Sequence, residues 1–143
     1  MTVEKLRQYR DKKREIALLK SQICRYRQQK REYVQDVVSG SEQEFPYRPQ
    51  KVHIQGYATQ TPQLLQRSIR RVQHKIDRLY TDLDEVDRFI ASVQDSQMRQ
   101  MITLRYVEGS TWPKIAHEIG ENDESFPRQK VRNYLERCGV KRS

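Results

Sequence analysis

The sequence predicts an all-α protein with two long coiled-coil helices and a C-terminal helix-turn-helix domain, and three observations support this prediction. Apolar residues make up 35% of the 143 residues and the mean hydropathy is −1.01, which leaves too little apolar surface for a large round core. Glycine and proline number five each, too few for an all-β fold with a turn about every ten residues. Apolar residues instead recur at spacings of three and four, which indicates narrow stripes on helices.

The first predicted element is a long basic coiled-coil helix over residues 1–38. This stretch contains neither proline nor glycine, and an apolar seam at heptad spacing runs along it, with Lys30 in its one polar position. The Ser-Gly-Ser tract at 39–41 is expected to end the helix. The seam consists of Ile16, Leu19, Ile23, Tyr26, Tyr33 and Val37.

Residues 39–62 are predicted to form a linker, because five of them are glycine or proline. Polar and apolar residues alternate over 51–55, so a short β element is expected there.

The second coiled-coil helix, over residues 63–94, gives the clearest pattern in the chain. Thr61 is predicted to cap it, and Pro62 suits its first turn, where a missing N–H is harmless. Sequence leaves open whether the two long helices pair antiparallel, pair parallel through the linker, or pair with another copy of the chain. The seam of the second helix consists of Leu65, Ile69, Val72, Ile76, Leu79, Leu83, Val86, Ile90 and Val93.

Residues 95–143 are predicted to form the helix-turn-helix domain. Asp95 and Ser96 can cap a new start, and three short helices are expected at 97–107, 111–119 and about 125–138. Gly120 supplies the turn between the second and third of these. The second helix is expected to bury Ile115, Ala116 and Ile119, with Thr111 as its cap; the third is expected to bury Val131, Leu135 and Cys138, with Tyr134 at the edge.

The charge of the chain favours an anionic partner, most often nucleic acid. Lysine and arginine number 28 against 19 acidic residues, a net charge of +9 with a pI near 9.7. Six of the last sixteen residues are basic and one is acidic. The cations of the first helix are spread around it, so a solvated face and a phosphate-binding face both remain possible for that helix.

The exposed face of the third short helix carries the side chains suited to reading bases. Arginine can bond guanine through two hydrogen bonds, and glutamine and asparagine can do the same with adenine. The base-contact candidates are Arg128, Gln129, Arg132 and Asn133, and the phosphate-contact candidates are Thr111, Lys114, Lys130, Lys141 and Arg142. Trp112 is expected to anchor neighbouring helices.

Residues 101–116, which read MITLRYVEGSTWPKIA, resemble the last DNA-binding region of bacterial sigma factors. With Phe-Pro-Tyr at 45–47 and Ile-Gln-Gly-Tyr at 54–57 between two coils, the layout of most of the chain resembles the ArpU/RinA-type phage regulators of late gene transcription. The four residues 121–124 lengthen the turn relative to a sigma-like unit and leave the start of the recognition helix open. The motif core would be Leu104, Tyr106, Trp112, Ile115, Ala116, Ile119, Val131 and Leu135.

The resemblance implies an all-helical DNA-binding activator at a promoter, without enzymatic activity or cofactor. The expected partners are double-stranded DNA, host RNA polymerase and further copies of the chain through the coiled coil, in the cytoplasm of a bacterial host cell. One alternative is a phage small terminase subunit that recognises packaging-site DNA and forms a closed ring. The other is a structural coiled-coil adaptor, which would be indifferent to Arg132→Ala and Gln129→Ala.

Other classes of protein find little support. No run of 18 apolar residues and no signal peptide is present, so no membrane association is expected. The three histidines fall in separate predicted elements, and neither Cys24 nor Cys138 has a local base, so no metal site and no catalytic thiol are expected. The acidic cluster of the second coil is interpreted as a solvated set that selects a partner; it consists of Asp82, Asp84, Glu85 and Asp87.

Overall fold

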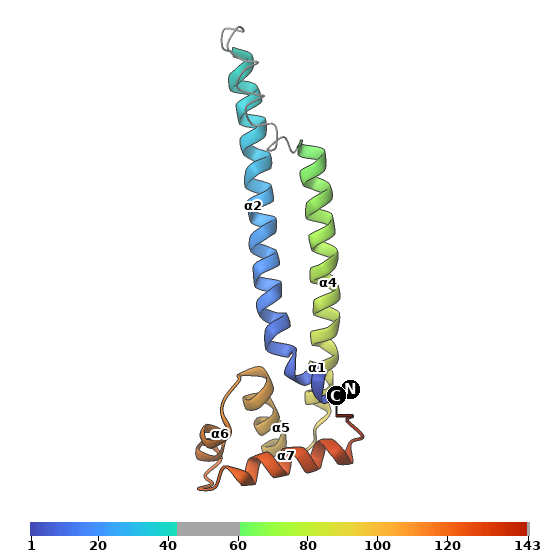
Figure 1. Cartoon of the computed structure of the whole chain (residues 1–143), viewed down its shortest axis with the longest axis vertical. Helices are drawn as coiled ribbons and strands as arrows, with labels where there is room; N and C mark the ends of the chain where they lie inside the picture. The colour runs from blue at the N-terminus through green and yellow to red at the C-terminus, as the bar shows by residue number, and fades with distance from the viewer. Residues whose placement is uncertain (43–60, 143) are drawn as a thin grey trace. The chain divides into compact units, whose positions relative to one another are not determined.

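The fold is all-α, as the sequence predicts. The computed structural model describes residues 1–42 and 61–142, with side chains for 1–35 and 61–142; the β element expected at 51–55 lies outside them. Within the described residues the only β pairing is an isolated bridge between Thr2 and Lys141. The elements in order are α1 (Val3–Arg7), α2 (Tyr9–Glu42), α4 (Pro62–Ser92), α5 (Ser96–Ile102), the π-helix η3 (Thr103–Val107), α6 (Trp112–Glu118) and α7 (Ser125–Arg137) (Figure 1).

The helices are divided between two compact units. The first, here called the N/C unit, joins Met1–Ile16 to Arg78–Ser143, and the second, the hairpin unit, is Ala17–Asp77. Both α2 and α4 contribute residues to both units. The beginning of the chain, predicted as the start of a coiled coil, therefore belongs to the same unit as the short C-terminal helices.

The first helix differs from its prediction at both ends. It is interrupted at Gln8, where α1 ends and α2 begins, and the Thr2 hydroxyl caps α1 by accepting a hydrogen bond from the Lys5 N–H at 3.2 Å. At its other end α2 continues past Val38 to Glu42. A glycine inside a helix costs only about 1 kcal/mol relative to alanine, so Gly40 weakens the helix without ending it.

The second long helix begins where the sequence predicts. Pro62 is its first residue, and the Thr61 hydroxyl accepts a hydrogen bond from the Leu64 N–H at 3.3 Å. Eight of the nine seam residues are buried, each at most 8% exposed, and Leu79 is half-buried. In the N/C unit α4 runs antiparallel to the chain through α1 and the start of α2, because Lys5 of α1 pairs with Glu85 while Lys12 of α2 pairs with Asp82.

The seam of α2 is buried only in part. Ile16 and Ile23 are buried and Leu19 and Tyr26 are half-buried, but Tyr33 is 40% exposed, contrary to expectation. Within the hairpin unit Lys30 contacts Gln66, which is about one turn from the first residue of α4. Tyr33, one turn further along α2, therefore lies beside the beginning of α4. The side chain of Val37, the last predicted seam residue, is not among those described.

The first predicted C-terminal helix is α5 continued by η3. The Asp95 carboxylate caps α5 by accepting a hydrogen bond from the Met98 N–H at 3.3 Å, as the sequence predicts. Met98, Met101 and Ile102 are buried. The last turn widens into a π-helix, in which the Glu108 N–H reaches the Thr103 carbonyl.

Gly120 forms the turn between α6 and α7. Its φ is +84°, a left-handed conformation that glycine adopts without a steric penalty. The Gly120 and Glu121 N–H groups donate to the His117 and Ala116 carbonyls at 3.2 and 2.8 Å, which is the bonding of a Schellman motif. Ending α6 in this way satisfies carbonyls that would otherwise lack a partner.

Of two local predictions in this region, that of the Thr111 cap is confirmed in position only and that of a buried Cys138 is wrong. Thr111 occupies the N-cap position of α6 in an extended conformation, but its side chain makes no capping hydrogen bond. Cys138 is exposed although its helical position is on the inward side of α7. The helix ends at Arg137, the chain turns at Gly139, and Val140 folds back into the core with its N–H bonded to the Leu135 carbonyl.

Replacing Gly120 by alanine is expected to lower the free energy of unfolding by about 1–2 kcal/mol, the cost of a left-handed residue that carries a Cβ. No atom lies within 4 Å of a Cβ at this position, so the backbone alone sets the cost. Gly120→Asn should lose less, because asparagine tolerates this conformation. Urea unfolding followed by circular dichroism checks the prediction, and equal losses for the two variants would contradict it.

Candidate nucleic-acid interface

The candidate interface is built on α7, whose apolar face is buried. Val131 is 1% and Leu135 is 4% exposed, and α7 packs against α5 and α6 (Figure 1). On α6, Ile115 and Ala116 are buried, and the small Ala116 permits close approach of a second helix. The remaining motif-core residues, Leu104, Tyr106, Trp112 and Ile119, are half-buried.

The four base-contact candidates lie on the face of α7 that points to solvent. Arg128, Gln129, Arg132 and Asn133 are all exposed. At about 100° per residue, Gln129 and Asn133 are central on this face, with the two arginines toward one side and Lys130 toward the other. Two amides flanked by cations are therefore presented together on one exposed helical surface.

A carboxylate that sequence reasoning missed lies on the same face. Glu136 Oε1 is 3.7 Å from Arg132 Nε and also accepts a hydrogen bond from Arg142. Glu136 is half-exposed, as are the two arginines. It therefore binds one base-contact candidate and one phosphate-contact candidate. The sequence signal for this ion pair is the spacing of four residues between Arg132 and Glu136, which places the two side chains next to each other on a helix.

The other side of α7 borders a groove. Its volume is about 450 Å³, and its lining includes Asn133 and Lys130 together with Arg137, which was not among the predicted site residues. The Lys130 ammonium lies over the Phe126 ring, 4.9 Å from its centroid. The complete lining is Asp95, Met98, Lys130, Asn133, Tyr134 and Arg137.

The beginning of α7 is fixed by an acidic turn. The Asp123 carboxylate accepts hydrogen bonds from the Ser125 N–H at 3.0 Å and from the Ser125 hydroxyl at 2.7 Å. These bonds lower the pKa of Asp123, the backbone bond most. The residues that lengthen the turn relative to a sigma-like unit therefore include the one that holds the first residue of α7 in place.

The phosphate-contact candidates are all exposed but come from separate places in the N/C unit. Thr111 and Lys114 lie at the start of α6, and Lys130 lies on α7. Lys141 and Arg142 directly follow α7. There the Lys141 carbonyl accepts a hydrogen bond from the Val3 N–H at 2.9 Å, so the two ends of the chain meet.

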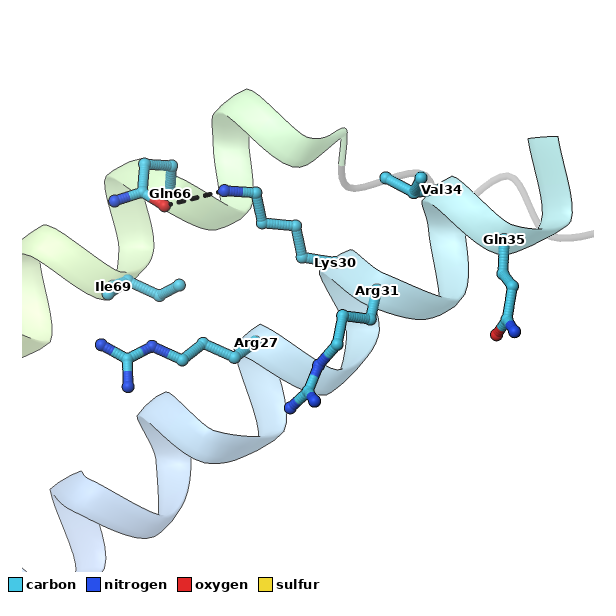
Figure 2. A pocket seen from close by; sticks show the side chains of 7 residues that line it. All are labelled: Arg27, Lys30, Arg31, Val34, Gln35, Gln66 and Ile69. Atoms are coloured by element: carbon cyan, nitrogen blue, oxygen red, sulfur yellow. Dashed lines mark hydrogen bonds between the residues drawn. The ribbon is translucent and has the colours of Figure 1, made fainter. Parts of the chain in front are cut away.

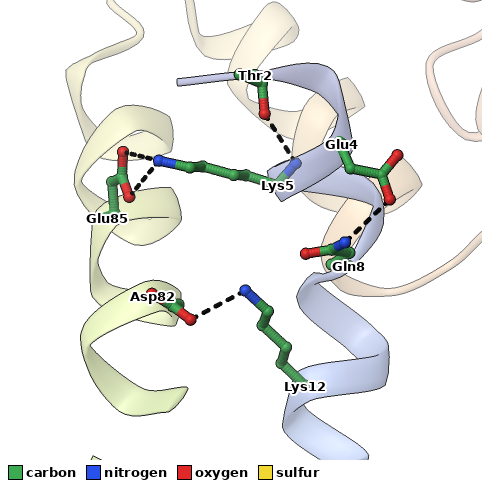
Figure 3. A network of polar contacts seen from close by, with 7 residues as sticks. All are labelled: Thr2, Glu4, Lys5, Gln8, Lys12, Asp82 and Glu85. Carbon is green, nitrogen blue, oxygen red and sulfur yellow. Dashed lines mark hydrogen bonds and ion pairs between the residues drawn. The ribbon is translucent and has the colours of Figure 1, made fainter. Parts of the chain in front are cut away.

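Residues 1–16 are held against α4 by polar contacts, most of which Figure 3 shows. Lys5 Nζ lies 2.9 Å from Glu85 Oε1, and Lys12 Nζ lies 3.0 Å from Asp82 Oδ2. The Tyr9 hydroxyl donates to Asp87 Oδ1 at 2.9 Å. Three members of the acidic cluster on α4, interpreted above as solvated and partner-selecting, therefore bind this chain's own N-terminal residues.

Apolar burial adds to this attachment. Leu6 has no exposed surface and Tyr9 is buried, and a fully buried leucine contributes about 1.5–3 kcal/mol, more than exposed ion pairs do. Arg10 reaches the turn before α6, where its guanidinium would collide with any Cβ placed on Gly109. The beginning of the chain thus helps to position the helices that carry the candidate interface.

No family model, curated protein or solved structure matches this chain. The resemblance to sigma factors and to ArpU/RinA-type regulators therefore depends on the sequence motifs alone. In the part of the chain that the structure describes, no helix combines the length and apolar character needed to cross a bilayer. Among the same residues, no three histidine, cysteine or acidic side chains are grouped so that they could hold a metal ion.

Replacing Tyr9 by phenylalanine removes the hydrogen bond to Asp87 and is expected to lower the free energy of unfolding by about 0.5–1.5 kcal/mol at neutral pH. Burial, followed by the hydrogen bond to Asp87, raises the pKa of Tyr9 to about 12. The folded state therefore keeps this proton at a pH where the unfolded state loses it. The difference in the free energy of unfolding between wild type and Tyr9→Phe should have its full value below pH 10 and should decline between about pH 10 and 12.

Urea unfolding of both proteins across this pH range measures the difference. Tyr33→Phe serves as the control, because Tyr33 is exposed and should contribute little at any pH. A constant difference between wild type and Tyr9→Phe from neutral to strongly alkaline pH would contradict the assignment.

Proposed function

We propose that the protein is a sequence-specific DNA-binding regulator of transcription in which α7 reads the major groove. One observation carries the proposal: α7 buries its apolar face against α5 and α6, while its opposite face exposes Arg128, Gln129, Arg132 and Asn133. This arrangement suits a recognition helix, which needs one face for support and the other for base edges.

The chemistry of the exposed face supports readout of mixed sequence. Gln129 and Asn133 can each bond an adenine through its N6 and N7 atoms, and Arg128 and Arg132 can bond guanine through O6 and N7. In this proposal Lys130, Lys141 and Arg142 contact phosphates around α7, and Thr111 and Lys114 contact phosphates at the start of α6. Phosphate contacts would fix the register of the helix without specifying sequence.

The biological setting follows from the sequence motifs. We propose a phage-type activator of late genes that works in the cytoplasm of a bacterial host, contacts the host RNA polymerase, and has neither enzymatic activity nor a cofactor. A homo-oligomer is part of the proposal, since paired recognition helices would read two half-sites. Sedimentation of the purified chain with and without DNA measures that part directly.

Alanine at Gln129 or Arg132 is expected to weaken binding to the target site by about 1–3 kcal/mol for each base contact removed, while binding to random duplex changes far less. The target is first obtained by capturing sheared DNA of the encoding genome on the purified protein at near-physiological salt and sequencing it. Arg14→Ala, which removes an exposed cation from α2, is the matched control and should leave the preference for the target intact.

The captured fragments separate the candidate functions. A single peak upstream of a late operon supports the regulator, whereas a peak at the packaging start would favour the small terminase subunit. A flat profile, or full target affinity in both alanine variants, would overturn base readout by α7 and favour the coiled-coil adaptor.

Glu136→Gln is expected to tighten binding to every duplex by about 1 kcal/mol, because it removes a negative charge near the phosphates and releases Arg132 and Arg142. The gain on random duplex should come from the lost negative charge and from Arg142, because phosphate contacts carry no sequence information, while release of Arg132, a base-contact candidate, should tighten target binding at least as much. Fluorescence anisotropy with both duplexes measures the two effects. Glu118→Gln, the same charge change on α6, is the control; weaker target binding by Glu136→Gln would instead indicate that Glu136 contacts a base itself.

A further inference from the structure

Charge is distributed unevenly along the two long helices. Residues 17–31 and 61–76, which belong to the hairpin unit, contain nine lysines and arginines and no acidic residue. The acidic residues of α4 begin at Asp77 and continue into the N/C unit, where they meet Lys5 and Lys12. The nine cations are Lys20, Arg25, Arg27, Lys30, Arg31, Arg67, Arg70, Arg71 and Lys75.

Part of this charge lines a groove between α2 and α4 within the hairpin unit. The groove has a volume of about 770 Å³, and Figure 2 shows the side chains around it. Three cations from consecutive turns of α2, Arg27, Lys30 and Arg31, lie on one side. The remaining lining is Val34, Gln35, Gln66 and Ile69, so no carboxylate is among these residues.

The three cations are not equivalent. Lys30 is half-buried and donates to the Gln66 amide oxygen across the groove at 3.1 Å, which holds its ammonium in place (Figure 2). Arg27 and Arg31 are exposed and one turn apart, about 6 Å along the helix. Neither forms an ion pair with any side chain that the structure describes. Two guanidinium groups are thus available beside a fixed ammonium.

We infer that this groove is a second binding site of the protein, for the phosphate backbone of duplex DNA. A guanidinium matches the geometry of phosphate oxygens with paired hydrogen bonds, and a row of cations without acids suits a regularly charged polymer. A protein partner would need aromatic anchors above all, and no aromatic side chain is among the lining residues, whose only apolar members are Val34 and Ile69. The inference rests on the proposed function for the identity of the duplex, but it adds contacts that are independent of sequence.

The test compares two double variants of the full chain that lose the same charge. Arg27→Gln/Arg31→Gln removes the exposed cations of the groove, and Lys13→Gln/Arg14→Gln removes two exposed cations from the start of α2. Glutamine is a good helix former, so both proteins should fold, which circular dichroism checks. Binding of a random-sequence duplex is measured by anisotropy across a salt series.

The groove variant is expected to reduce the magnitude of the slope of log K against log [salt] by about 1.8, the value for two lost phosphate contacts. The control should retain the wild-type slope. A groove variant that keeps the wild-type slope would overturn the groove as a binding site. A control variant whose slope falls by the same amount would also overturn it, because the loss of overall charge alone would then explain the change.

A third arm separates this inference from the proposed function. Gln129→Ala/Asn133→Ala removes candidate base contacts on α7 and should leave the salt slope on random duplex unchanged while lowering the preference for the target. If wild type binds DNA with no sequence preference and the groove variant still loses slope, base readout fails and the groove stands. If target preference is lost only in the α7 variant and the groove variant keeps its slope, the groove fails and base readout stands. Absence of any duplex binding by wild type would overturn both.

Discussion

The fold depends on the burial of narrow apolar stripes, because little other apolar surface exists in the chain. With 35% apolar residues, each helix can bury one stripe and must leave the rest of its surface to charge. On α4 that stripe is the seam from Leu65 to Ile90, and on α7 it is Val131 and Leu135. The helix faces that are not used for packing are therefore free to bind a partner. On α7 this exposed face carries the two amides and the arginines.

Charged side chains differ between the two units in whether they find a partner within the chain. In the N/C unit the carboxylates of α4 are met by Lys5, Lys12 and the Tyr9 hydroxyl, so they are used within the chain. In the hairpin unit Arg27 and Arg31 have no such acidic partner among the described side chains. On α7 a single carboxylate, Glu136, pairs with Arg132 and Arg142, and it thereby limits the positive potential of the exposed face of this helix.

Local signals in the sequence predicted most of the helical framework but not the contacts between distant residues. The seam of α4, the caps at Thr61 and Asp95 and the turn at Gly120 depend on spacings of a few residues, and each was predicted. The attachment of residues 1–16 to α4 joins positions some 70 to 80 residues apart, and no periodicity encodes it. For the candidate site, sequence identified which α7 residues are exposed, because helical spacing fixes their side of the helix; it missed Glu136 and Arg137, which looked like ordinary surface residues.

The position of α7 is determined at both of its ends. At its start Asp123 holds Ser125, and at its end the Val140 N–H returns to the Leu135 carbonyl while Lys141 bonds Val3. The second attachment makes the end of the candidate recognition helix depend on the first residues of the chain, which are themselves fixed by the burial of Leu6. The orientation of the exposed face of α7 thus depends on the whole N/C unit. If the short helices over 95–143 were separated from the beginning of the chain, α7 would lose one of its two supports.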